Sequence, residues 1–125
     1  MPSEGECIAG RYRLECPLGE GGMGSVWRAR HLELDAPIAI KFQHAHRASS
    51  KGAAARFRRE ARAAAKLRNP HVVRVVDFGF DSDVPYIAME LLEGLSLKAR
   101  LEQKLSPSIE EALEFTRQAS SALDA

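Results

Sequence analysis

The chain has 125 residues, of which 45% are hydrophobic and 28% charged, a balance that excludes intrinsic disorder and suits one domain with a single core. Its 18 Lys and Arg residues against 17 Asp and Glu residues leave a formal net charge of +1, so overall charge favours neither nucleic acid nor membrane as a partner. No apolar run approaches the ~20 residues that a membrane-spanning helix needs, and no secretory leader is recognisable. Cys7 and Cys16 fit neither a disulfide framework nor a zinc site, so we expect a cytoplasmic protein with two free thiols.

Charge is nevertheless distributed unevenly along the chain. Residues 41–74 carry ten basic side chains and one acidic side chain, whereas residues 75–125 carry four basic and ten acidic ones. The single acid within the basic segment is Glu60. Because no nucleic-acid-binding motif is present, we expect a solvated helix face and no nucleic-acid partner.

The first third of the chain predicts an antiparallel meander. Residues 1–10, rich in Gly, Ser, Pro and Glu, indicate a loose N-terminal arm. Alternation of apolar and polar residues from Tyr12 to Cys16 predicts a first strand. Residues 25–30 and 37–42 predict two more, joined by short turns.

The pattern then alternates between helices and strands. Good helix formers without Gly or Pro predict a helix over residues 53–67, which Asn69 and Pro70 close. Residues 72–78 and 86–92 predict two further strands with a turn between them.

The C-terminal part predicts two helices. The first covers residues 95–105, and the last is an amphipathic helix that starts within residues 106–111. Its start has two alternatives: Ser106 caps with Pro107 in the first helical position, or Ser108 and Glu111 form a capping box.

Four glycines lie within six positions, from Gly19 to Gly24, between two predicted strands. The pattern G-x-G-x-x-G alone is a weak signal. A Walker A loop would need Lys before Ser25, and a dinucleotide fold would need a helix after the glycines, whereas a strand follows. A glycine-rich hairpin that covers the phosphates of a nucleotide fits the arrangement, because its backbone N–H groups can approach where side chains would collide. A plain hairpin turn would need only one or two glycines.

Lys41 and Glu60 are a candidate pair. Lys41 ends an apolar strand, a position where a lysine is ordinarily a surface residue. Glu60 lies mid-helix, and an ion pair with Arg56 would be worth only about 0.2–0.5 kcal/mol. A carboxylate near the apolar side of a helix favours a cationic partner, so we expect Glu60 to form an ion pair with Lys41. This pair would direct the lysine toward the glycine hairpin, where the lysine would contact phosphates.

At this point the chain resembles the start of a eukaryotic-like bacterial serine/threonine protein kinase. The segments that carry the resemblance are residues 18–26 (Leu-Gly-Glu-Gly-Gly-Met-Gly-Ser-Val), 38–41 (Ile-Ala-Ile-Lys), 57–61 (Phe-Arg-Arg-Glu-Ala), 69–73 (Asn-Pro-His-Val-Val) and 87–94 (Ile-Ala-Met-Glu-Leu-Leu-Glu-Gly). They cover roughly residues 10 to 125 in the order and at the spacing of the family.

The resemblance implies an α+β fold and an ATP site. The fold would be a kinase small lobe of residues 11–92, with a five-stranded antiparallel sheet and the helix known as αC, followed at residues 93–125 by two helices of an incomplete large lobe. Lys41 would contact the α- and β-phosphates, and Glu60 would orient it. The remaining implied nucleotide-binding residues are Leu18, Gly19, Glu20, Gly21, Gly22, Met23, Gly24, Ser25, Val26, Ala39, Met89, Glu90 and Leu92. Of these, Leu18, Val26 and Ala39 would enclose the adenine, and the main chain of Glu90 and Leu92 would hydrogen-bond it.

The family transfers phosphate from ATP, with Mg²⁺, to Ser or Thr of a protein substrate. That chemistry needs a catalytic loop, H-R-D-x-x-x-x-N, and a metal-binding D-F-G, neither of which we identify in this sequence. Asp77-Phe78-Gly79 spells D-F-G but precedes the hinge segment, so we expect the end of a strand, with Asp77 in or near a turn, and no metal-binding role. We therefore expect these 125 residues alone to be inactive.

The main alternative is a non-catalytic nucleotide-binding or interaction module. The apolar face of the last helix, through Leu113 and Leu123, could associate with a second copy or with a complete kinase.

Overall fold

The computed structural model describes residues 2–21, 24–43 and 52–125, which divide into two compact units. One unit combines residues 1–66 with residues 74–91, and the other combines residues 67–73 with residues 92–125. The elements are β1 (Cys7–Ile8), β2 (Tyr12–Gly21), β3 (Gly24–His31), β4 (Ala36–Gln43), α2 (Ala53–Ala65), β5 (Val75–Asp81), β6 (Val84–Met89), α3 (Leu97–Glu102) and α4 (Ile109–Leu123).

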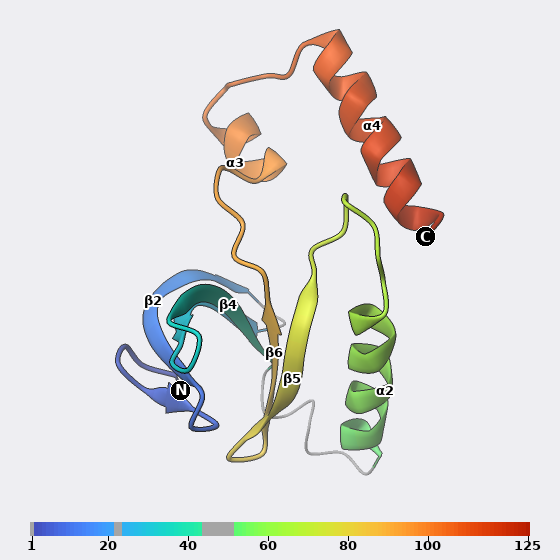
Figure 1. The fold of residues 1–125 in the computed structure, drawn as a ribbon. Coiled ribbons are helices and arrows are strands. Elements are labelled where there is room, and N and C mark those ends of the chain that lie inside the picture. The colour runs from blue at the N-terminus through green and yellow to red at the C-terminus, as the bar shows by residue number, and fades with distance from the viewer. Residues whose placement is uncertain (1, 22–23, 44–51) are drawn as a thin grey trace. The chain divides into compact units, whose positions relative to one another are not determined.

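The first unit is a curled antiparallel sheet with α2 alongside β5 (Figure 1). Its strand order is β1-β2-β3-β4-β6-β5, so the predicted meander is confirmed as β2-β3-β4. The predicted number of five strands is wrong, because the sheet has six. The sixth strand is β1, in the segment expected to be a loose arm. Gly10 turns with a φ of 69°, which lets Ile8 pair with Tyr12 and become buried.

The hairpin of β5 and β6 also differs from the prediction. Residues Ser82 and Asp83 both have positive φ, as a two-residue hairpin turn requires, so the strands extend almost to the turn. As a result Asp77 lies within β5, opposite Ala88. The prediction that it lies in or near a turn is therefore wrong.

The two faces of the sheet differ in what covers them. The inner face carries a buried cluster that fills the curl of the sheet: Ile8, Tyr12, Leu14, Trp27, Ala29, Ile38, Ile40, Phe42, Tyr86 and Ala88. Alternate residues of the same strands point to the outer face. There α2 packs through Phe57, whose ring lies edge-on to Phe78 at 6.1 Å and to Phe80 at 5.3 Å between centroids.

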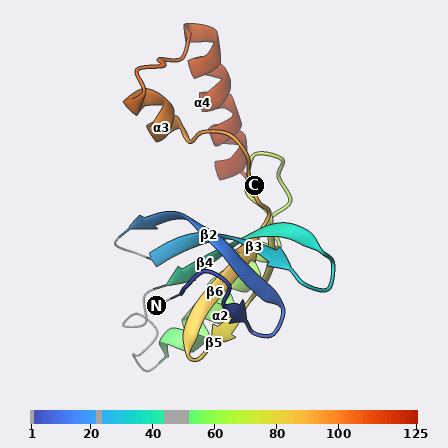
Figure 2. The same cartoon turned by 90° about the vertical axis from the view of Figure 1, so that its left-hand side faces the viewer.

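The second unit contains α3 and α4, which an extended segment joins (Figure 2). Of the two predicted starts of α4, the capping box is confirmed: the Ser108 side chain accepts from the Glu111 N–H, and the Glu111 carboxylate accepts from the Ser108 N–H. Glu111 also forms an ion pair with Arg100, 2.9 Å long, and this contact ties the two helices together. No helix in the described parts of the chain is both long and apolar enough to cross a membrane.

Candidate functional site

A cross-strand row on the outer face of the sheet brings predicted site residues together. Gly19 of β2 lies opposite Val26 of β3, Val26 lies opposite Lys41 of β4, and Lys41 lies opposite Ile87 of β6. The row continues to Phe78 of β5. Because directly paired residues project to the same face, Val26, Lys41 and Ile87 point to the same side of the sheet.

The glycine cluster forms the predicted hairpin between two strands. Glu20 pairs with Ser25 and Gly21 with Gly24, at the end of the β2–β3 ladder. Gly24 has a φ of 150°, and a Cβ on it would lie 1.8 Å from the carbonyl oxygen of Phe42. At Gly19 and Gly21, by contrast, nothing lies within 4 Å of the Cβ position. One glycine therefore permits close strand packing, while two leave space above the hairpin. Gly22 and Met23 lie outside the described residues.

A second row on the same face contains residues predicted to meet a base. Ala39 of β4 lies opposite Met89, the last residue of β6. Ala39 is buried, Met89 is half-buried, and Leu18 on β2 is 53% exposed. Together with Val26, the pair of Ala39 and Met89 forms an apolar strip next to Lys41.

Two hydrogen bonds hold Glu90, the first residue after β6, to the main chain of Arg74. The N–H of Glu90 donates to the carbonyl of Arg74 at 2.9 Å, and its carboxylate accepts from the N–H of Arg74 at the same distance. Leu92, the second residue predicted to contact a base through its main chain, belongs to the other unit and is 67% exposed.

Lys41 and Glu60 are not joined in this structure. Both side chains are exposed, and among the described residues neither takes part in an ion pair within 4.0 Å. The Lys41 side chain and helix α2 are nevertheless on the same side of the sheet. Phe57 packs on Phe78, which lies two strands, or about 10 Å, from Lys41, and Glu60 follows Phe57 by about one helical turn.

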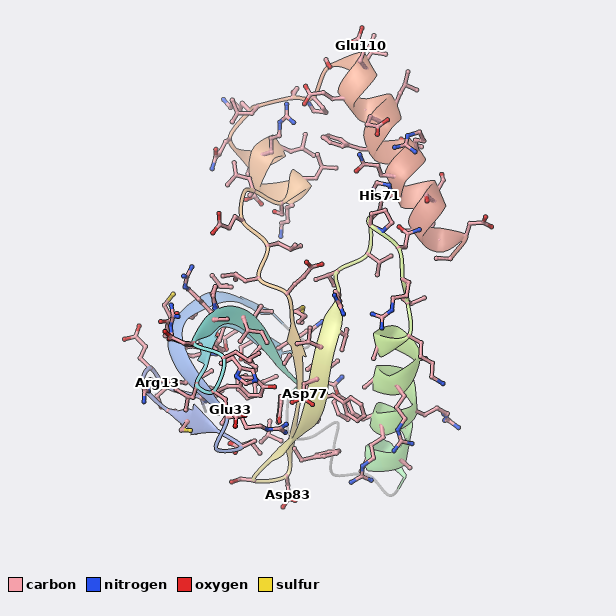
Figure 3. The ribbon with its side chains drawn as sticks, viewed as in Figure 1. Arg13, Glu33, His71, Asp77, Asp83 and Glu110 are labelled. Atoms are coloured by element: carbon pink, nitrogen blue, oxygen red, sulfur yellow. The ribbon has the colours of Figure 1, made fainter. Side chains whose placement is uncertain are left out.

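Asp77 lies on the opposite face and is engaged by the sheet itself (Figure 3). Its carboxylate accepts a hydrogen bond of 2.5 Å from the Tyr12 hydroxyl and forms an ion pair of 3.0 Å with Arg11. Burial, followed by the hydrogen bond to Asp77, raises the pKa of Tyr12, and the Asp77 charge raises the pKa of Arg11. Asp77 therefore closes the curled sheet by linking β2 to β5. No cluster of metal-ligating side chains occurs within the described ranges.

Ile87 and Phe78 are outer-face residues that were not among the predicted site residues. Ile87 is the cross-strand neighbour of Lys41, and Phe78 connects that row to α2. Alternation along β6 could have identified Ile87, because it shares a face with Met89. Phe78 carried no such signal, since its role depends on a helix distant from it in sequence.

Comparison with known proteins places this site in a family context. The family model described as "Protein kinase domain" matches residues 12–125. The chain is 45% identical over 94 residues to the serine/threonine-protein kinase pkn3 of Myxococcus xanthus, covering 74% of this chain and 17% of that protein. It is 37% identical over 119 residues to PrkC of Bacillus subtilis, covering 95% of this chain and 18% of that protein.

Solved structures give the same result for the fold. The kinase domain of Mycobacterium tuberculosis PknI superposes with a TM-score of 0.84 at 27% identity, over 99% of this chain and 51% of that one. The chain thus spans less than a fifth of these two curated relatives and about half of that kinase domain.

Proposed function

This chain belongs to the protein kinase family, and we propose that it forms the ATP-binding part of a serine/threonine protein kinase domain. The observation that carries the proposal is the outer-face row of Gly19, Val26, Lys41 and Ile87 beneath the glycine hairpin. The activity of the whole protein would be ATP-dependent phosphoryl transfer to Ser or Thr of a protein substrate, in the cytoplasm, where both free thiols stay reduced.

The apolar strip would bind the adenine. A purine needs a flat apolar slot with main-chain hydrogen-bonding groups at its edge. Leu18, Val26 and Ala39 would supply the slot and Met89 its back wall. Since the N–H of Glu90 is engaged by Arg74, the carbonyl is the main-chain group of Glu90 that would accept from the base. The Leu92 N–H would donate to it.

The glycine hairpin and Lys41 would bind the triphosphate. The hairpin, residues 19–25, would present backbone N–H groups to the β- and γ-phosphates, and the space above Gly19 and Gly21 is what such an approach needs. The Lys41 ammonium would contact the α- and β-phosphates. Glu60 would orient it once α2 and the nucleotide bring the two side chains together.

The residues that transfer phosphate are not supplied by this half of the domain. No cluster in the described ranges can hold Mg²⁺, and Asp77 is committed to Arg11 and Tyr12. The sequence of 125 residues also contains no H-R-D loop to supply a base. We therefore expect nucleotide binding by this chain without phosphoryl transfer.

Titration of the chain with a fluorescent ATP analogue tests the proposal. Loss of one charge-assisted contact predicts that Lys41→Met weakens binding by roughly 10- to 100-fold. Because Lys41 is exposed, the thermal midpoint should not change. Lys98→Met, which removes an exposed cation in the other unit, is the matched control and should bind like the wild type. Equal affinity of both variants, or no detectable binding by the wild type, would contradict the assignment.

A second candidate function rests on the exposed apolar face of α4. Ile109 is 79% exposed, Leu113 67% and Leu123 88%. Such a face supports a non-catalytic module that pairs with a second copy or with a complete kinase. Sedimentation velocity over a range of concentrations tests it: a concentration-dependent rise in mass that Leu113→Glu abolishes supports pairing, and a constant monomer rules out self-association.

A further inference from the structure

Helix α2 has two sides of opposite chemical character. Ala53, Phe57 and Ala61 are buried against the sheet. At 100° per residue, the four cations of the helix and the lysine at its C-cap occupy an arc of about 160° centred opposite Phe57. They are Arg56, Arg58, Arg59, Arg62 and Lys66, and all five are exposed. Several side chains that end in nitrogen project from the side of α2 turned away from β5, while Arg58 reaches back to the ring of Phe80 on β5 (Figure 3).

Within the described parts of the chain, none of these five cations forms an ion pair with an acid. In the described ranges every ion pair involves residues outside α2, and the only acid on the helix, Glu60, lies at the edge of the buried side. Arg58 stacks over the ring of Phe80, with 5.0 Å from its guanidinium carbon to the ring centroid. Like charges one turn apart, such as Arg58 and Arg62 or Arg62 and Lys66, destabilise an isolated helix. An anionic surface would relieve that repulsion.

We propose that this cationic side of α2 is a docking surface for an anionic lipid bilayer. A cluster of four to eight Lys and Arg residues on one helix face is the composition that binds acidic lipid headgroups. The side is convex and about 20 Å long, which suits a flat partner. Between the cations stand only Ala55 and Ala63, so the side offers no aromatic ring for stacking a base and no apolar anchor for a protein groove.

The uneven charge of the chain favours docking through α2. The net charge is only +1, so a bilayer attracts the whole chain weakly. Residues 53–66 carry five basic side chains and one acidic side chain, so the attraction is concentrated on this helix. The attraction therefore depends on where the cations lie and not on their sum.

Co-sedimentation with vesicles tests the proposal on the chain as it is. The chain should bind vesicles that contain phosphatidylglycerol, should not bind pure phosphatidylcholine, and should dissociate as salt shortens the Debye length below about 10 Å. The variant Arg59→Gln, Arg62→Gln, Lys66→Gln should lose partitioning by on the order of 100-fold, since each cation near an acidic bilayer is worth about fivefold.

A matched variant separates placement from net charge. Arg13→Gln, Arg74→Gln, Lys98→Gln removes three exposed cations outside α2 and should retain partitioning within a few-fold of the wild type. An unchanged thermal midpoint shows that each variant folds. Equal losses in the two triple variants, or no binding of the wild type to acidic vesicles, would overturn the proposal. Binding to duplex DNA that depends on α2, without binding to vesicles, would overturn it in favour of a nucleic-acid surface.

Discussion

The ring of Phe57 on α2 lies edge-on against the ring of Phe78 on β5, with 6.1 Å between the centroids. Phe78 is in register with Ile87, and Ile87 with Lys41, so this contact attaches the helix to the face of the sheet that carries the lysine. The distance over which Glu60 must reach Lys41 is therefore determined by an aromatic contact and not by the two charged groups.

Phe57→Ala tests the importance of that contact. Phe57 is 5% exposed, and removal of a buried phenylalanine side chain should lower the free energy of unfolding by about 3–5 kcal/mol. Denaturant titration followed by the fluorescence of Trp27, the single tryptophan, reports on this unit. Arg59→Ala, on the exposed side of the same helix, should stay within about 0.5 kcal/mol of the wild type. A similar small effect for Phe57→Ala would show that α2 is held in another way.

The glycines of the hairpin should respond differently to the same substitution. Gly24→Ala would place a Cβ 1.8 Å from the Phe42 carbonyl oxygen, so β3 and β4 must separate, at a cost of about 1–3 kcal/mol or more in unfolding free energy. Gly19→Ala meets nothing within 4 Å and should leave stability nearly unchanged, while it weakens binding of an ATP analogue. The pair of variants therefore separates a packing role from a binding role. Equal destabilisation by both would contradict this division.

The Tyr12–Asp77 hydrogen bond predicts a loss of stability at alkaline pH. Burial and Asp77 raise the pKa of Tyr12 above its ordinary value of 10.0, so the folded chain keeps this proton to a higher pH than the unfolded chain. The contribution to stability is complete below pH 10 and falls above it, by up to about 1.4 kcal/mol per pH unit for one group.

Tyr12→Phe is the variant that checks this pH dependence. At neutral pH it should lower the free energy of unfolding by about 0.5–1.5 kcal/mol, because one hydrogen bond is lost. Above pH 10 its stability should decline less steeply than that of the wild type. Some slope should remain, because burial also raises the pKa of Tyr86. Identical slopes in denaturant titrations at several pH values would refute the prediction.

The start of α4 should weaken in acid. The hydrogen bond from Arg100, followed by that from the Ser108 N–H, lowers the pKa of Glu111 from 4.5 to about 2. A depressed carboxyl pKa stabilises the folded state above the ordinary value, and this stabilisation is lost as the pH falls from about 4.5 toward 2. Circular dichroism of the wild type should show helix loss in this window. Glu111→Gln should flatten the change, while Glu110→Gln, which alters an exposed carboxylate, should not.

Local features of this protein followed from the sequence because they depend on neighbouring residues. The Ser108–Glu111 capping box, one of the two starts that the sequence offered for α4, involves residues three apart, and the cluster of four glycines indicated the hairpin. Strand pairing places Val26 opposite Lys41, and Ala39 shares their face because it lies two residues from Lys41 on the same strand. The α+β fold and the nucleotide-binding residues were implied by the resemblance to protein kinases, and the fold is confirmed.

Contacts between distant segments were decided only by the tertiary structure. The pairing of Ile8 with Tyr12 depends on a turn in a segment whose composition indicated a loose arm. The bond between Tyr12 and Asp77 joins residues 65 positions apart, and no periodicity relates them. The distance between Lys41 and Glu60 also depends on the tertiary structure. The sequence supplies both charges, but the packing of Phe57 on Phe78 determines how far apart they lie.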